Sequence, residues 1–344
     1  MRQVELGQTG LRVSDVAFGG IPIQRLTEQG AVEVVRRCLD LGVTMLDTAH
    51  GYGTSEERIG IAIQGRRDGL ILATKSPARE AGPFREQMEL SFQRLGADYI
   101  DLFQFHNIST PEALEQVLAP GGPMDIAREA RDAGRIGHIG VTSHKLEMAI
   151  EMAGSGLFET MMFPFNYITN EPAEKLIPIC RKNGVGFIAM KPMGGGLLED
   201  ATLSFKFLRQ YEGVVPVVGI ERIAEIEEIV EIMEGPAAFT AAEQARMAEI
   251  TEYLGTRFCR RCDYCQPCPQ GIQISTVMNI KSFGRRMPPE RVYGEWGRSL
   301  IAEAETCIVC GECAARCPYG LPVPEMIAQN ASWYHEQMAV HGTQ

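Results

Sequence analysis

The feature that most limits the fold of this chain is the alternation, between Val13 and Glu234, of short apolar or β-branched runs with amphipathic segments. In the segments 84–96 and 222–233, the large apolar side chains recur on one face of a helix. We therefore expect eight strands, each followed by a helix. The expected strands span residues 16–20, 43–49, 70–75, 99–106, 136–143, 160–166, 186–192 and 214–220.

The expected strands are almost continuously apolar, as strands are when both faces of a parallel sheet are covered. Eight strand–helix units in about 220 residues fit a (β/α)8 barrel, which usually has about 250 residues. The alternative is an open doubly wound sheet, which usually has fewer strands and a G-x-G-x-x-G turn after the first strand. The corresponding turn here reads FGGIP, at residues 18–22. We therefore predict an α/β fold built on a (β/α)8 (TIM) barrel.

The last quarter of the chain has a different composition, because eight of the ten cysteines follow residue 258. The other two, Cys38 and Cys180, fall on apolar positions of expected helices and are predicted to be small core residues. A helical segment at 239–255 separates the two parts. We predict a barrel at residues 1–238, a linker helix at 239–256, and a small helical, ferredoxin-like two-cluster domain at 257–344.

Charge and hydropathy exclude several classes of function. The net charge is −11, with 33 basic and 44 acidic residues, and the arginines form pairs but no long basic block, which argues against nucleic-acid binding. No apolar run approaches the about 18 residues that a membrane helix needs. The first ten residues are polar and have no apolar signal core. We expect a soluble cytoplasmic protein that binds neither nucleic acid nor a membrane.

Four polar residues stand at or just after the ends of consecutive expected strands: Asp47 and Tyr52 follow the second, Lys75 the third and His106 the fourth. In a parallel barrel these ends meet at one rim, where active sites lie. A phenol with its reference pKa of about 10 gives up a proton poorly at neutral pH, and a neighbouring ammonium favours the phenolate. A carboxylate would position the lysine, and an imidazole would hydrogen-bond a carbonyl oxygen.

Each of the four residues also has an ordinary explanation. An aspartate before a turn often caps a helix, a lysine at a strand end is often solvated, and a histidine can be part of the core. Their recurrence at consecutive strand ends favours a shared site.

The segments that hold these four residues, LDTAHGYG (46–53), LATK (72–75) and DLFQFH (101–106), resemble the aldo-keto reductases, (β/α)8 enzymes that use a nicotinamide cofactor. Residues 6–20 are similar to the N-terminal hairpin and first strand of that family, and the resemblance covers about residues 1–235. It implies reduction of an aldehyde or ketone. In that reaction Tyr52 would be the general acid, Asp47 and Lys75 would tune it, and His106 would orient the carbonyl.

The resemblance also implies a set of residues that hold NAD(P)H. Thr142 and Ser143 match the pair that holds the carboxamide, and Met162 stands where a glutamine is usual. The stretch 219–228 matches the part that binds the adenosine phosphate; there Arg222 is the phosphate partner, and Glu221 would repel a 2′-phosphate. The choice between NADH and NADPH stays open, as does the alternative that 222–228 is a solvated helix face. The expected cofactor residues are Gly20, Thr142, Ser143, Met162, Lys191, Met193, Gly219, Arg222 and Glu228.

The cysteines form two runs of four. The second run matches C-x2-C-x2-C-x3-C-P, the bacterial [4Fe–4S] spacing in which the fourth thiolate usually binds the other cluster. The first run is one residue shorter before its last cysteine. A zinc ribbon is the alternative, but it explains the prolines and the four-cysteine runs poorly. We predict two [4Fe–4S] clusters. By analogy with the bacterial pattern, Cys259, Cys262, Cys265 and Cys317 would hold one and Cys307, Cys310, Cys313 and Cys268 the other, and the spacing alone leaves open which cysteines share a cluster.

With these clusters attached, the whole chain resembles the ferredoxin-bearing branch of the aldo-keto reductases. We expect a nicotinamide-dependent reductase of a small-molecule carbonyl substrate, coupled to or stabilised by its clusters. A hydride carries two electrons and a cluster accepts one, so the clusters could feed the barrel, connect it to an external redox carrier, or only support the fold. Two alternatives are an electron-transfer enzyme with a flavin or other cofactor at the barrel mouth, and a redox-sensing module that binds nicotinamide.

Overall fold

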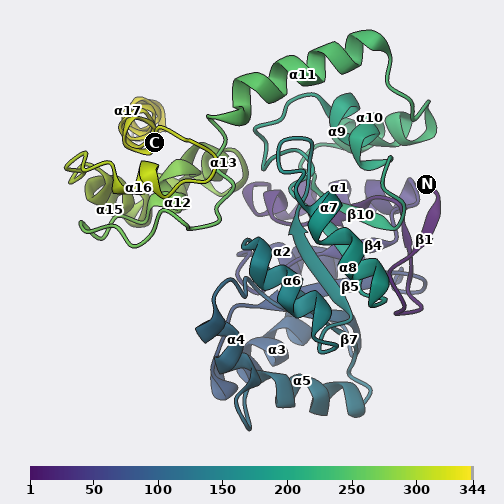
Figure 1. The fold of residues 1–344 in the computed structure, drawn as a ribbon. Coiled ribbons are helices and arrows are strands. Elements are labelled where there is room, and N and C mark those ends of the chain that lie inside the picture. The colour runs from purple at the N-terminus through teal and green to yellow at the C-terminus, as the bar shows by residue number, and fades with distance from the viewer. Residues whose placement is uncertain (342–344) are drawn as a thin grey trace. The chain divides into compact units, whose positions relative to one another are not determined.

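The computed structural model describes residues 1–341, and the chain divides into two compact units (Figure 1). The first unit comprises Met1–Phe239, and the second begins at Thr240. Each unit has a hydrophobic core of its own and is described by itself.

Eight parallel strands of the first unit form a closed barrel in the order β10-β3-β4-β5-β6-β7-β8-β9. Each observed strand lies within or extends by one residue beyond an expected one, so the predicted (β/α)8 barrel is confirmed. The strands are β3 (Ala17–Gly19), β4 (Met45–Asp47), β5 (Ile71–Ser76), β6 (Ile100–Phe105), β7 (Ile136–Thr142), β8 (Thr160–Pro164), β9 (Gly186–Met190) and β10 (Val214–Gly219).

An N-terminal hairpin of β1 (Gln3–Glu5) and β2 (Arg12–Ser14) closes one end of the barrel. Its Leu6 and Val13 are fully buried in the same cluster as the barrel-interior side chains. The amide N–H of Gln8 donates to the carbonyl oxygen of Gly184, just before β9, over 2.7 Å. The hairpin therefore covers the N-terminal ends of the strands, and the rim formed by their C-terminal ends is a separate surface.

The helices cover the outside of the barrel because each buries one apolar face. In α3 (Ala81–Leu95) the buried positions include Phe84, Met88 and Phe92, and the helix ends at Gly96 in the left-handed conformation (φ 58°) that glycine adopts readily. The other helices are η1 (Pro22–Arg25), α1 (Glu28–Asp40), α2 (Ser55–Ala62), α4 (Pro111–Leu118), α5 (Pro123–Asp132), α6 (Leu146–Gly154), α7 (Pro172–Lys175), α8 (Ile177–Lys182), α9 (Ala201–Leu208) and α10 (Ile223–Glu234).

Cys38 in α1 and Cys180 in α8 are core residues, as predicted. Both are buried, and burial raises the pKa of each thiol to about 12. They are therefore protonated at neutral pH and are poor nucleophiles and poor metal ligands.

The second unit is helical. It begins with α11 (Ala241–Gly255), whose first turn is capped by Thr240 and Glu243 and in which no residue is buried. Its core includes Val277, Leu300 and Tyr334, and the Tyr334 hydroxyl donates to the carbonyl oxygen of Val292 over 3.1 Å. The remaining helices are α12 (Ile274–Met278), α13 (Ile280–Arg286), α14 (Pro289–Val292), α15 (Glu295–Ala304), α16 (Glu312–Ala315) and α17 (Val323–His341). Across residues 1–341, no helix combines the length and apolar character required to span a membrane.

Candidate functional site

The barrel rim brings the four predicted polar residues together. Asp47 is the last residue of β4, Lys75 the last but one of β5, and His106 directly follows β6. Parallel pairing aligns these ends, since Asp47 lies opposite Ala73 in β5. Tyr52 lies in the turn between β4 and α2. The common rim follows from the parallel register of three consecutive strands.

A buried ion pair forms the base of this site. The Lys75 ammonium Nζ lies 2.5 Å from Asp47 Oδ2 and donates to the carbonyl oxygen of Thr48 over 2.7 Å. Lys75 is 1% exposed and Asp47 3%. Burial raises the pKa of the Asp47 carboxyl, while the charge of Lys75 and hydrogen bonds from Lys75 and Gln104 act in the opposite direction. A buried charge is tolerated only with such partners, so each side chain depends on the other.

Tyr52 and His106 lie beside this pair. Lys75 Nζ is 5.2 Å from the centroid of the Tyr52 ring, close enough for its charge to act on the phenol. The Tyr52 and His106 rings meet edge to face, with centroids 5.8 Å apart and planes at 85°. Both rings are half-buried. The arrangement offers a phenol and an imidazole to solvent next to the buried Lys75 ammonium group.

Two further residues hold this site and were missed by the sequence reasoning. Gln104 Nε2 donates to Asp47 Oδ1 over 3.1 Å, and Gln104 is fully buried. It lies in β6, two residues before His106, so period-two alternation continued from His106 could have identified it. Arg79 donates to the carbonyl oxygen of His106 over 2.7 Å. Arg79 lies in the loop after β5, where no periodic signal exists.

The expected carboxamide-binding residues lie at the end of β7 and are buried. Thr142 Oγ1 accepts a hydrogen bond from the amide N–H of Asn107 over 2.7 Å, and its hydroxyl can still donate one. Ser143 Oγ accepts from the amide N–H of Lys145 over 3.2 Å. Both hydroxyls thus hold loops at the rim. Met162 belongs to the barrel interior and is only 2% exposed, so it is a packing residue in this structure.

Four more of the expected cofactor residues lie at or near strand ends of the barrel. Lys191 follows β9 in a left-handed conformation (φ 57°), and its Nζ lies 3.0 Å from His144 Nε2. Met193, two residues further, is half-buried. Gly20 follows β3; a Cβ there would lie 2.4 Å from Ser55 Oγ, so only glycine fits. Gly219 is the exposed last residue of β10.

The start of α10, where the adenosine phosphate was expected, is occupied by a carboxylate of the chain itself. Glu225 Oε2 accepts from the amide N–H groups of Glu221 and Arg222 over 2.9 and 3.1 Å. Its Oε1 accepts from Arg222 Nε over 2.8 Å. Arg25 pairs with Glu221 over 3.4 Å, and Glu228 is exposed one turn further. The Glu225 carboxylate therefore already accepts the hydrogen bonds of the backbone N–H groups and of Arg222 that a bound phosphate would need as donors.

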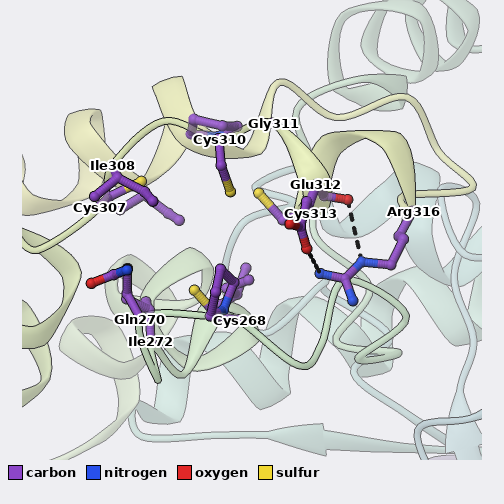
Figure 2. A pocket seen from close by; sticks show the side chains of 14 residues that line it. Cys268, Gln270, Ile272, Cys307, Ile308, Cys310, Gly311, Glu312, Cys313 and Arg316 are labelled. Atoms are coloured by element: carbon purple, nitrogen blue, oxygen red, sulfur yellow. Dashed lines mark hydrogen bonds and ion pairs between the residues drawn. The ribbon is translucent and has the colours of Figure 1, made fainter.

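The eight clustered cysteines line two pockets. One, of about 360 Å³ and partly open to solvent, is lined by Cys268 and by three cysteines of the second run. Figure 2 shows the sulfurs of Cys268, Cys310 and Cys313 turned toward one common space. The other pocket, of about 340 Å³, is lined by Cys317 and by three cysteines of the first run. The last cysteine of each run thus joins the other set, as the crosswise assignment expects.

These pockets fit clusters better than single metal ions. In residues 1–341, no three His, Cys, Asp or Glu side chains lie close enough to share one ion. Zinc, with Zn–S bonds of about 2.3 Å, would require sulfurs almost in contact, whereas a four-iron cluster needs them spread around a larger volume. Burial raises the pKa of Cys262 to about 11 and that of Cys265 to about 12. Ligation by these thiols must therefore release protons.

The two units together define an iron–sulfur oxidoreductase built on a TIM barrel. Residues 15–206 match the family model of the Aldo/keto reductase family, and residues 258–322 match that of the 4Fe-4S dicluster domain. The chain belongs to the aldo/keto reductase family, whose members are NAD(P)-dependent oxidoreductases, and carries a 4Fe-4S dicluster domain. The predicted family and the two predicted [4Fe–4S] clusters are confirmed.

Individual relatives are also aldo-keto reductases or other oxidoreductases by name. The chain is 30% identical to the aldo-keto reductase YhdN of Bacillus subtilis over 236 residues, and this alignment covers 62% of this chain and 70% of YhdN. It is 29% identical over 214 residues to L-galactose dehydrogenase of Arabidopsis thaliana, covering 57% of this chain and 66% of that protein. An aldo-keto reductase structure from Bacillus halodurans superposes with a TM-score of 0.63 and 22% identity, covering 73% of this chain and 96% of its own. An aldo/keto reductase structure from Klebsiella pneumoniae, determined with NADP and acetate, superposes with a TM-score of 0.59 and 20% identity, covering 72% of this chain and 95% of its own.

Proposed function

We propose that the barrel reduces the carbonyl group of a small aldehyde or ketone, with NAD(P)H as the hydride source and Tyr52 as the proton donor. The observation that carries this proposal is the position of Lys75. Its Nζ lies 2.5 Å from Asp47 Oδ2, in an ion pair, and 5.2 Å from the centroid of the Tyr52 ring. The family supports the reaction class, and the Klebsiella relative determined with NADP supports the cofactor.

NAD(P)H, when bound, supplies the hydride that the carbonyl carbon accepts. Tyr52 donates its proton to the carbonyl oxygen, and His106 donates a hydrogen bond to the same oxygen, which orients the substrate. The charge of Lys75 stabilises the phenolate left on Tyr52. Because the Tyr52 ring is half-exposed, water can return the proton after each turnover.

The remaining residues act by position. Asp47 neutralises Lys75 and holds its ammonium in place, and Gln104 fixes the Asp47 carboxylate from the other side. The side chains that would hold the nicotinamide are those of Thr142, Ser143, Lys191 and Met193, which lie at or just after the ends of β7 and β9. Thr142 can donate a hydrogen bond to the carboxamide oxygen while it accepts one from Asn107.

The test is Tyr52→Phe, measured as nicotinamide oxidation with a panel of aldehydes and ketones under anaerobic conditions. We expect turnover to fall by about 10²–10⁴-fold, with cofactor affinity nearly unchanged, because a positioned acid is lost and packing is kept. Tyr253→Phe, at an exposed position of α11, is the matched control and should leave turnover unaltered. Wild-type turnover in Tyr52→Phe would show that another group donates the proton. An absorption spectrum of the same protein would reveal a flavin if the electron-transfer alternative were correct.

We propose further that the clusters, when bound, would relay electrons one at a time from an external one-electron carrier to a carbonyl at the barrel mouth, so that two electrons and two protons reduce it to the alcohol in place of NAD(P)H. Support comes from the exposed Cys310, which would leave the cluster of its pocket accessible to a one-electron carrier. Six of the eight cluster cysteines belong to or pack against the hydrophobic core of the second unit, so a purely stabilising role is the alternative. The variants Cys310→Ala and Cys313→Ala distinguish clusters that transfer electrons from clusters that only stabilise the fold, when both activities and the thermal stability are measured. In the coupled case, activity with an artificial one-electron donor is lost and nicotinamide-driven reduction persists. In the purely stabilising case, both activities fall together with thermal stability.

A further inference from the structure

The Arg79 guanidinium joins the two loops that follow β5 and β6 at the rim of the barrel. Its Nη1 donates to the carbonyl oxygens of Pro77 and Ala78 in its own loop, over 2.7 and 3.4 Å. Its Nη2 donates to the carbonyl oxygens of His106 and Asn107 in the other loop, over 2.7 and 3.0 Å. Each terminal nitrogen of the planar guanidinium thus binds one loop, and the spacing of the two nitrogens fixes the distance between the loops.

Backbone carbonyls, and no carboxylate, are the partners of this arginine. Arg79 is half-buried, and burial lowers the pKa of its guanidinium from the ordinary value, but an arginine stays charged at neutral pH. In residues 1–341, no carboxylate lies within ion-pairing distance of Arg79. A half-buried charge without an opposite charge is costly unless hydrogen bonds compensate it. The bonds to the four carbonyl oxygens are therefore the interactions that hold the guanidinium at the rim.

The carbonyls of His106 and Asn107 face the same way, which is unusual for neighbouring residues at the end of a strand. In an extended strand, consecutive carbonyls point in opposite directions. Here both oxygens lie within 3.0 Å of one nitrogen, so the backbone turns between them. Asn107 makes this turn in the left-handed region (φ 61°), which asparagine tolerates but which is unfavourable for most residues. A cation bonded to both oxygens favours the turned backbone over an extended one.

The same turn is held from β7 by its amide groups. The N–H of Asn107 donates to Thr142 Oγ1 over 2.7 Å, and that of Ile108 donates to the carbonyl oxygen of Thr142 over 2.8 Å. The guanidinium holds the turn from the opposite neighbour, through its carbonyls. The His106 ring, which the first residue of this turn carries, meets the Tyr52 ring with centroids 5.8 Å apart. Because the backbone of His106 sets the direction of its side chain, a shift of these carbonyls would move the imidazole relative to Tyr52.

We propose that Arg79 is a positioning residue for carbonyl reduction: its bonds to the carbonyl oxygens of His106 and Asn107 hold the His106 imidazole where it donates a hydrogen bond to the substrate. In this role Arg79 acts through His106 and does not itself touch the reacting atoms. A hydrogen-bond donor stabilises the transition state best when it is fixed in place beforehand. A displacement of about 1 Å at such a group can lower the rate by about 10²-fold. The inference rests on the proposed function, in which His106 orients the carbonyl.

The experiment compares Arg79→Ala with wild type in the full chain, purified anaerobically. Nicotinamide-driven reduction of the best aldehyde or ketone of the panel is measured with and without added guanidinium ion, and nicotinamide affinity is measured separately. Arg209→Ala is the matched control, because Arg209 Nη1 also donates to two backbone carbonyls, those of Ile232 and Gly235, over 2.9 Å each. Neither carbonyl belongs to the candidate site. His106→Ala and the double variant Arg79→Ala/His106→Ala complete a double-mutant cycle. Amide hydrogen exchange is followed in the peptide that contains His106.

We expect kcat to fall by about 10–10²-fold in Arg79→Ala, with nearly unchanged nicotinamide affinity and faster exchange in the His106 peptide. Added guanidinium should restore part of this kcat. Arg209→Ala should keep the wild-type kcat and show no response to guanidinium. In the His106→Ala background, loss of Arg79 should cost little more, because the group through which it acts is already absent.

Three outcomes would overturn the inference alone: a wild-type kcat in Arg79→Ala, an equal loss in Arg209→Ala, or a full second loss of rate in the double variant. If Arg79→Ala does not fold, Arg79→Lys takes its place, because lysine keeps the charge but cannot bind both loops with a planar pair of nitrogens. A smaller loss of kcat is then expected, and a wild-type kcat would again overturn the inference. A wild-type protein that reduces no carbonyl would overturn the proposed function and this inference with it.

Discussion

Replacing Lys75 by methionine isolates the role of the buried ion pair. The change keeps most of the side-chain volume but leaves the Asp47 carboxylate, 3% exposed, without the ammonium 2.5 Å away. The hydrogen bond from Gln104 remains. Removing one partner of a buried pair typically costs about 3–5 kcal/mol in the free energy of unfolding, because the other charge stays buried. We expect a loss of this size for the barrel unit at neutral pH, together with loss of carbonyl reduction.

The loss should depend on pH. In Lys75→Met, burial raises the pKa of Asp47 without the opposing charge of Lys75, so the folded state holds a proton that the unfolded chain, with a reference pKa of about 3.9, has released. Below about pH 4 both states are protonated and the penalty is small. As the pH rises above that value, unfolding releases a proton, and the penalty grows until the folded-state pKa is passed.

Urea unfolding followed by far-ultraviolet circular dichroism at several pH values measures this effect. Both tryptophans, Trp296 and Trp333, lie in the second unit, so indole fluorescence would report the wrong part of the chain. Hydrogen exchange of peptides from β4, β5 and β6 assigns the transition to the barrel. The double variant Asp47→Asn/Lys75→Met should recover most of the stability and none of the activity. A Lys75→Met protein as stable as wild type at neutral pH, or a deficit independent of pH, would refute the reasoning.

Three further predictions follow from the site and the pockets. Anaerobically purified protein should contain about eight irons and eight sulfides per chain. Cys317→Ala should lose the iron of the pocket lined by Cys317 and the first run, while the other pocket keeps its iron. Loss of iron from the other pocket would contradict the crosswise sets. Gln104→Leu should destabilise the barrel by about 1–3 kcal/mol, since Asp47 Oδ1 loses its donor, and unaltered urea unfolding would show that the bond contributes little. If the cofactor phosphates reach the start of α10, kcat/KM should be higher for NADH than for NADPH. Glu225→Gln keeps a capping oxygen but removes its charge, so it should reduce the ratio of kcat/KM for NADH to kcat/KM for NADPH. A preference of the wild type for NADPH would refute this prediction.

Much of the fold could be predicted from the sequence because its determinants are local. A buried parallel strand requires a nearly continuous apolar run and its covering helix an apolar face, and both patterns repeat eight times before residue 239. Asp47, Lys75 and His106 could be grouped for the same reason, since parallel strands in register bring their C-terminal ends to one rim. The cysteine spacings are equally local, because a cluster loop needs its ligands within a few residues of one another.

The tertiary structure alone decided how side chains distant in sequence are paired. Gln104 meets Asp47 across 57 positions of sequence. Glu225 covers the start of α10, where sequence alone left Arg222 available for a phosphate. Arg260 packs on an aromatic ring, whereas Ile308, which also follows the first cysteine of its run, lies in solvent. Such outcomes depend on which surfaces the packed helices and strands leave within reach, and a one-dimensional pattern carries no record of those distances.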